Sequence, residues 1–109
     1  MSKNTKSTGV DVASLNLVDE PEMRQFVMHV GEHRARMEYD RHGDRIFLTR
    51  TEVPKHLQEQ GVATVLTEKT LSHLEASKMK LVPLCPKVKD FLRQNPSWQR
   101  LLLKGVQLR

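Results

Sequence analysis

Between residues 51 and 86 the sequence changes from the alternation of a β-strand to the spacing of a helix and back again. Thr51-Glu52-Val53-Pro54 ends a strand, because proline cannot donate to a β-ladder. A turn that contains Gly61 leads into a helix, and a short apolar strand then ends at Leu84-Cys85-Pro86. A helix N-terminus has unpaired N–H groups and a partial positive charge. This order predicts an anion site beside a cysteine and a glutamate.

Alternating segments precede this stretch. Residues 25–30, 34–40 and 45–53 each have apolar side chains at every second position, which is typical of half-buried strands. The inward-facing residues of the first two are Phe26, Met28, Val30, Ala35, Met37 and Tyr39. Turn signals around Gly31 and Gly43 join the segments. We therefore expect an antiparallel meander.

Helical spacing begins at Gly61, and apolar residues at intervals of three and four predict an amphipathic helix over residues 61–77. Residues 81–84 are then expected to form a short buried strand. A second helix over residues 87–94 should end before Pro96, because the residue before a proline disfavours helical geometry. Residues 97–103 are either a last helical turn or a strand, with Trp98, Leu101 and Leu102 packed on the sheet. The fold class is α+β.

The length of 109 residues indicates one domain. Residues 1–20 are polar and aperiodic and are expected to be a disordered tail, so the domain would cover residues 21–109. The sequence contains no apolar run near the roughly 20 residues of a membrane span and no secretory signal at its start. A single cysteine allows no intrachain disulfide, which fits a reducing compartment. We expect a cytoplasmic monomer without a membrane partner.

The net charge of +5 leaves open whether the basic side chains serve nucleic acid, a small polyanion or only solvation. The charges are scattered, and an aromatic content of 5% argues against stacking on bases, so a nucleic-acid partner is not expected. No histidine or cysteine spacing suits zinc, and we predict no metal site. His73 falls in the apolar stripe of the first helix and is interpreted as a hydrogen-bonded core residue.

The segment Gln58-x-x-Gly61-x-Ala63 resembles the acyl-CoA pyrophosphate loop of the GNAT superfamily of N-acetyltransferases, whose pattern is Arg/Gln-x-x-Gly-x-Gly/Ala. With Thr51-Glu52-Val53-Pro54 before it and Pro83-Leu84-Cys85-Pro86 after the helix, the chain resembles the small, single-domain branch of that superfamily over residues 26–102. The resemblance implies the acyl-CoA N-acyltransferase fold. In this fold the meander is followed by two parallel strands that splay apart, with the 61–77 helix as their right-handed crossover.

The resemblance also implies that acetyl-CoA, or coenzyme A, binds in the gap between the splayed strands, with the backbone amides of Gln60 to Ala63 on the pyrophosphate. The cofactor-binding residues that it implies are Val53, Gln58, Gln60, Gly61, Val62, Ala63 and Thr64. A side chain at Gly61 would block the close approach of the phosphates. A bulky substitution there is therefore expected to abolish binding and to leave the fold intact.

Cys85 and Glu52 are the candidate catalytic residues. A thiolate at Cys85 would accept the acetyl group, and Lys87 and the start of the second helix would favour that thiolate. The alternative is that Cys85 is a small buried hydrophobe. Glu52 would take the proton that an attacking amine must lose. The alternative is that Glu52 is a solvated or ion-paired carboxylate on the surface.

The leading functional hypothesis is an acetyl-CoA-dependent N-acetyltransferase acting on a primary amine, either a small molecule or a protein lysine. A binding module that holds acyl-CoA without turnover is the alternative. It is suggested by positions where the chain departs from the family pattern: Arg50, Glu59 and Phe91. A small nucleic-acid-binding protein is the third hypothesis. The sequence does not identify the acceptor amine.

Overall fold

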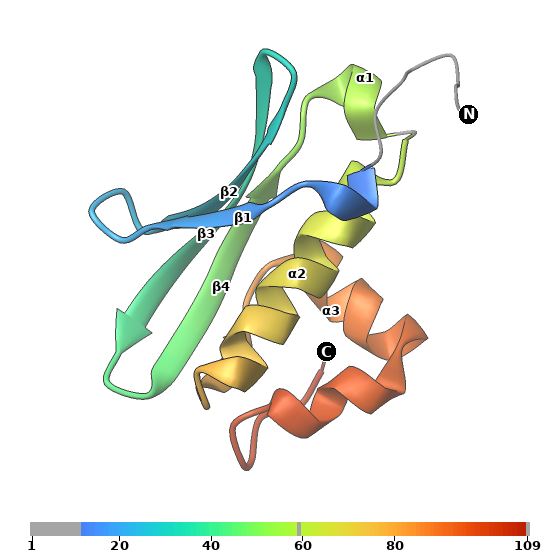
Figure 1. Cartoon of the computed structure of the whole chain (residues 1–109). Coiled ribbons are helices and arrows are strands. Elements are labelled where there is room, and N and C mark those ends of the chain that lie inside the picture. Colours follow the sequence, from blue (N-terminus) through green and yellow to red (C-terminus); the bar gives the residue numbers. More distant parts are fainter. Residues whose placement is uncertain (1–11, 59, 109) are drawn as a thin grey trace.

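The computed structural model describes residues 12–58 and 60–108, and Figure 1 shows a curved sheet with helices packed against it. The elements in chain order are η1 (Val12–Ser14), β1 (Leu17–Glu20), β2 (Gln25–Val30), β3 (His33–His42), β4 (Arg45–Glu52), α1 (Lys55–Gln58), α2 (Val62–Ala76), β5 (Lys80–Pro83), α3 (Pro86–Gln94) and η2 (Pro96–Leu101).

The sheet has the strand order β1-β2-β3-β4-β5. The strands from β1 to β4 pair antiparallel, and β4 and β5 pair parallel. Helix α2 connects the parallel pair and crosses the sheet (Figure 1). The α+β class, the meander and the parallel pair predicted from the sequence are therefore confirmed.

Residues 12–20 are not a disordered tail, and this part of the sequence-based prediction is wrong. Residues 17–20 form β1, which pairs with β2 from Leu17 opposite Met28 to Glu20 opposite Gln25. The strand is also held from the side, because the Tyr39 hydroxyl donates to an Asp19 carboxylate oxygen at 2.6 Å. A strand of four residues is too short to show a clear alternation. Residues 1–11 of the predicted tail lie outside the described residues.

The hydrophobic core lies between the sheet and α2, α3 and η2. Its sheet side carries the inward-facing residues expected from the sequence: Phe26, Met28, Val30, Ala35, Met37 and Tyr39. Residues 97–103 combine both expected forms, since η2 is followed by an isolated parallel bridge between Leu81 and Leu102. Leu101 is buried, and Trp98 and Leu102 pack partly buried against the core, as expected.

The expectation for His73 is wrong. Its side chain is exposed on α2, where its ring lies edge-on to Phe26 with 5.3 Å between ring centroids. The helical stripe predicted a buried position, but the described burial places Leu71 and Leu74 on the core side instead. His73 therefore covers the edge of the core.

The parallel pair separates before β4 ends. Pairing runs from Arg45 opposite Lys80 to Leu48 opposite Pro83. The N–H groups of Leu84 and Cys85 then both donate to the Leu48 carbonyl, at 2.9 and 3.0 Å, and the chain turns into α3. Strand β4 continues to Glu52 along β3, after a register shift opposite Glu38 and Tyr39. Such a bulge bends a strand and increases its local twist. The result is the splay between β4 and β5 expected of this fold.

Candidate functional site

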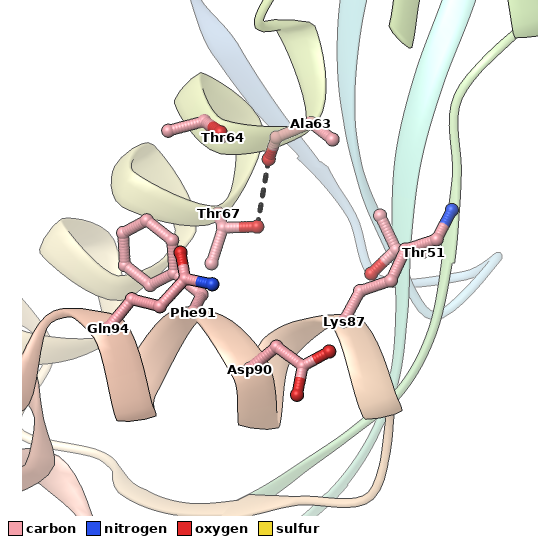
Figure 2. Close-up of a pocket in the computed structure, with 8 residues that line it drawn as sticks. All are labelled: Thr51, Ala63, Thr64, Thr67, Lys87, Asp90, Phe91 and Gln94. Atoms are coloured by element: carbon pink, nitrogen blue, oxygen red, sulfur yellow. Dashed lines mark hydrogen bonds between the residues drawn. The ribbon is translucent and has the colours of Figure 1, made fainter.

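A groove of about 210 Å³ lies where β4, α2 and α3 meet, beside the part of β4 that has separated from β5 (Figure 2). Its walls are formed by Thr51 of β4, by Ala63, Thr64 and Thr67 of α2, and by Lys87, Asp90, Phe91 and Gln94 of α3. The α2 wall is built from small side chains, and the Thr67 hydroxyl is turned inward to the Ala63 carbonyl at 2.9 Å. The Thr67 hydroxyl therefore occupies the Ala63 carbonyl on this wall.

The start of α2 is the part of the groove suited to an anion. Gly61 occupies the N-cap with φ 77° and ψ 14°, a left-handed conformation that favours glycine, and within the described residues no side-chain hydrogen bond caps the helix. The first N–H groups of a helix have no intrahelical acceptor. Those of Val62, Ala63 and Thr64 lie at the positive end of a 15-residue helix, and Ala63 and Thr64 also line the groove.

Other residues of the predicted loop are engaged within the protein. The Gln58 side-chain amide donates to the Val53 carbonyl at 3.1 Å, and the Gln60 N–H donates to the Leu57 carbonyl at 3.1 Å. These bonds close α1 over the end of β4. Val62 is 0% exposed as a whole residue, backbone included, so it does not line the groove. Of the predicted cofactor-binding residues, Ala63 and Thr64 line the groove. Glu59 lies outside the described residues.

Cys85 is the N-cap residue of α3, and its side chain is 3% exposed. Its Sγ lies 3.3 Å from Oγ1 of Thr51, and that hydroxyl also lies 3.2 Å from Sδ of Met37. Since Thr51 lines the groove, the thiol lies directly behind a groove residue. The structure thus places the predicted cysteine next to the groove, with the Thr51 hydroxyl between its thiol and the groove.

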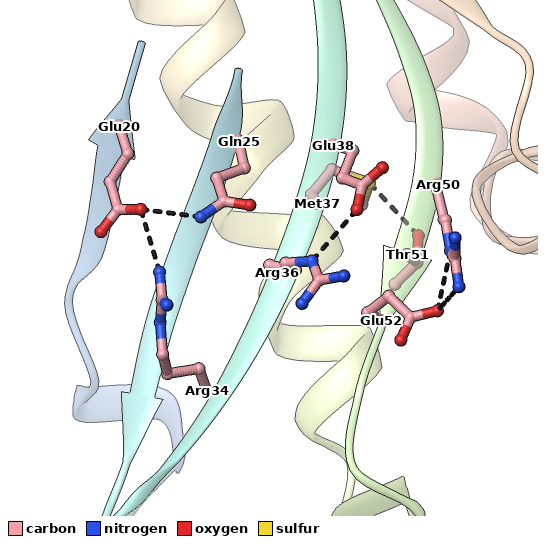
Figure 3. Close-up of polar contacts among 9 residues, drawn as sticks. All are labelled: Glu20, Gln25, Arg34, Arg36, Met37, Glu38, Arg50, Thr51 and Glu52. Carbon is pink, nitrogen blue, oxygen red and sulfur yellow. Dashed lines mark hydrogen bonds and ion pairs between the residues drawn. The ribbon is translucent and has the colours of Figure 1, made fainter. Parts of the chain in front are cut away.

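Glu52 lies on the opposite face of β4 from Thr51, because successive strand residues alternate (Figure 3). Its carboxylate accepts a hydrogen bond from Nε of Arg50 at 2.8 Å. This bond and the charge of Arg50 lower the pKa of Glu52, and the more distant cations Arg36 and Lys87 lower it further. The carboxylate is therefore ionised at neutral pH and is a weakened base. The two predicted catalytic residues do not meet on one face.

The sequence analysis did not identify the α3 wall of the groove. Lys87, Asp90, Phe91 and Gln94 are spaced i, i+3, i+4 and i+7, which places them along one face of a helix. Asp90 is paired with Arg93 of the same helix at 2.7 Å, whereas Lys87 faces the groove beside Thr51 (Figure 2). Because this helix was predicted, its polar stripe was the available signal for a second wall.

Comparison with known protein families finds a match over most of the chain. The model of a family described as GCN5-related N-acetyl-transferase covers residues 25–101, from the start of β2 to the end of η2. All residues that line the groove fall inside this range. A search of curated proteins gives no match.

Proposed function

Because the family match at residues 25–101 covers more than half of the chain, the protein belongs to the GCN5-related N-acetyltransferase family, and we propose that it transfers an acetyl group from acetyl-CoA to a primary amine. The family supports an acetyltransferase function in general. The observation that carries the finer proposal is the end of β4–β5 pairing at Leu48, which opens β4 onto a groove with an uncapped helix N-terminus.

The groove suits the chemistry of coenzyme A. In this proposal the pyrophosphate binds the N–H groups of Ala63 and Thr64, where the helix dipole favours negative charge. The pantetheine arm, which carries amide groups, lies along the separated part of β4 near Thr51. Lys87 adds a positive charge on the opposite wall. The thioester then lies near the end of β4, close to Cys85.

Transfer has two possible routes. In the direct route the neutral amine attacks the acetyl carbonyl carbon, the carbon–sulfur bond to coenzyme A breaks, and the amine proton goes to a base, for which Glu52 is the candidate. In the covalent route the Cys85 thiolate attacks first and coenzyme A leaves as a thiolate. The amine then attacks the acetyl carbon, the carbon–sulfur bond to Cys85 breaks, the amine proton goes to a base such as Glu52, and the amide and the Cys85 thiolate are released. The proposal includes a small molecule or a protein lysine as acceptor.

Acetyl-CoA binding at the α2 N-terminus is tested by Thr64→Asp. Thr64 is exposed on the third residue of α2, where a carboxylate favours the helix but repels a pyrophosphate. Calorimetric titration with acetyl-CoA should show affinity reduced at least about tenfold, which corresponds to roughly 1.4 kcal/mol. Ser72→Asp adds the same charge to an exposed position near the other end of α2 and should bind as the unmodified protein does.

A thermal melt separates binding from folding, because Thr64→Asp should melt no lower than the unmodified protein. Equal loss of affinity in Thr64→Asp and Ser72→Asp would show that net charge, and not the start of α2, governs binding. Unchanged affinity in both would place the cofactor elsewhere. Either result would contradict the proposed site.

A second function, acyl-CoA binding without turnover, is favoured by two observations. Cys85 is 3% exposed, and the Glu52 carboxylate is bonded to Arg50. The two functions are distinguished by incubating the protein with acetyl-CoA and a lysine-containing peptide or a small primary amine. Mass spectrometry would detect the acetyl amide if the protein is a transferase. Calorimetric binding with no acetylated product from either acceptor would support the binding module.

A further inference from the structure

Three side chains from three elements form a buried chain of polar contacts behind the groove. Met37 of β3 and Thr51 of β4 are register partners, and Cys85 begins α3. Their residues are 0%, 6% and 3% exposed. The Thr51 hydroxyl lies between the two sulfur atoms, at 3.2 Å from Met37 and 3.3 Å from Cys85, and Figure 3 shows its contact with Met37.

The hydroxyl has only one proton for these two neighbours. A thioether sulfur accepts and never donates, whereas a thiol can do both. With Cys85 protonated, Thr51 can donate to Met37 and accept from the Cys85 S–H. With Cys85 as thiolate, the sulfur can only accept, and the Thr51 proton must turn from Met37 to stabilise it. The two protonation states of Cys85 therefore use the same hydroxyl in opposite directions.

We propose that Thr51 is a positioning residue for Cys85, donating its proton to the thiolate, and that Met37 competes for this proton and so favours the thiol. The inference rests on the covalent route of the proposed function, in which Cys85 receives the acetyl group. Hydrogen bonds to charged groups are stronger than those between neutral groups. Turning the hydroxyl toward Cys85 thus replaces a weak contact to a thioether with a strong one to an anion.

Charged groups also surround the row of contacts from Met37 to Cys85, but the Thr51 hydroxyl is the closest polar partner of the Cys85 thiol. On α3, Lys87 and Asp90 line the groove, and Asp90 is paired with Arg93. On β3 and β4 the flanking charges are Arg36, Glu38, Arg50 and Glu52, which alternate to the outer face and form the pairs Arg36–Glu38 and Arg50–Glu52. The residues of α2 that line the groove are uncharged. Lys87 is the remaining cation that favours the thiolate, and it is retained in every variant below.

The test is the titration of the Cys85 thiolate by its ultraviolet absorbance in the free protein. Cys85 is the single cysteine of the chain, so the signal belongs to it alone, and Cys85→Ala supplies the blank. Thr51→Val keeps the branched shape and removes the proton, and its titration midpoint should rise by about one pH unit. Thr51→Ser restores the hydroxyl and should titrate close to the unmodified protein.

Met37→Leu is the second variant, and its titration midpoint should shift in the opposite direction. It conserves volume in the core, which such substitutions tolerate well. Without a competing acceptor the Thr51 proton is free for Cys85, and the midpoint should fall by about half a pH unit, because a thioether is a weak acceptor. A merely structural role would loosen the site in both variants and move both midpoints in the same direction.

The outcomes are distinguishable from those of the proposed function, because this titration needs no acetyl-CoA. Opposite shifts in Thr51→Val and Met37→Leu, with Thr51→Ser near the unmodified value, support the inference. Shifts of the same sign, or a Thr51→Ser protein that titrates like Thr51→Val, overturn it. If Thr51→Val does not fold by circular dichroism, an unchanged or raised midpoint in Met37→Leu is enough to overturn it. If the two variants show the expected opposite shifts and Cys85→Ala still transfers the acetyl group fully, only the covalent route is refuted.

Discussion

Gly61→Ala should weaken coenzyme A binding and also destabilise the fold, whereas Gly43→Ala should do only the second. Gly61 has φ 77° at the N-cap of α2, and Gly43 has φ 62° in the β3–β4 turn. A Cβ added at either position meets no atom within 4 Å. The two variants therefore have the same kind of backbone strain and no steric clash, and they differ in their distance from the proposed site.

The cost in stability comes from the backbone alone. A residue with a side chain loses about 1–2 kcal/mol in the left-handed conformation, and the smaller unfolded-state entropy of alanine returns about 0.4–1 kcal/mol. The net destabilisation is about 1 kcal/mol for each variant, which should lower Tm by roughly 4–8 °C. A cost of this size leaves the protein folded well below Tm, so the sequence-based expectation that substitution at Gly61 leaves the fold intact stays a prediction.

The effect on binding is separate. A methyl group at Gly61 stands beside the N–H groups proposed to hold the pyrophosphate, and loss of one hydrogen bond to a charged group weakens affinity roughly tenfold or more. Calorimetry with acetyl-CoA, performed well below both melting temperatures, should show this loss for Gly61→Ala and none for Gly43→Ala. If both variants bind equally well, the pyrophosphate does not contact the α2 N-terminus. If Gly61→Ala melts like the unmodified protein, the strain argument is wrong.

Two further outcomes are expected. The pKa of Tyr39 is raised above its ordinary value, first by burial and then by its hydrogen bond to Asp19, so its contribution to stability is complete below about pH 10 and is lost as pH rises further. Urea unfolding between pH 7 and 11 should show Tyr39→Phe less stable at neutral pH and less sensitive to alkali, and parallel curves for the two proteins would contradict this. In the covalent route, acetyl-CoA without an amine should add one acetyl group to Cys85, Cys85→Ala should lose transfer, and Glu52→Gln should mainly slow it. An active Cys85→Ala protein with an impaired Glu52→Gln protein, measured by amide formation, would instead establish the direct route.

The sequence predicted most of the fold because most of its elements bury one face. The strands from β2 to β5 and the helices α2 and α3 lie within one or two residues of their expected bounds. Strand β1 was missed because Leu17–Glu20 buries little side-chain surface and is held by pairing to β2. Backbone pairing between segments leaves almost no trace in local composition, so such a strand is visible only in three dimensions.

The site was predicted in outline and not in detail. Linear order placed Cys85 and the start of α2 near the same strand ends, which the structure bears out through Thr51. It could not show that the amide of Gln58 is bonded to the Val53 carbonyl, because the bend made by α1 is set by tertiary packing of Leu57. It also grouped Glu52 with Cys85, since both lie at strand ends, although alternation along β4 turns Glu52 to the outer face.

The separation of these two residues constrains any mechanism that uses both. Acetyl-CoA in the groove would reach Cys85 from the helix side of the sheet, where Thr51 lies, whereas a proton accepted by Glu52 must come from the outer face. Strands β4 and β5 separate beyond Leu48 and Pro83, and exposed Leu84 follows directly on the β5 side. An amine that attacks an acetyl group near Cys85 and passes its proton to Glu52 must therefore lie in this gap. Pairing to Arg50 keeps the Glu52 carboxylate ionised and directed to that outer side.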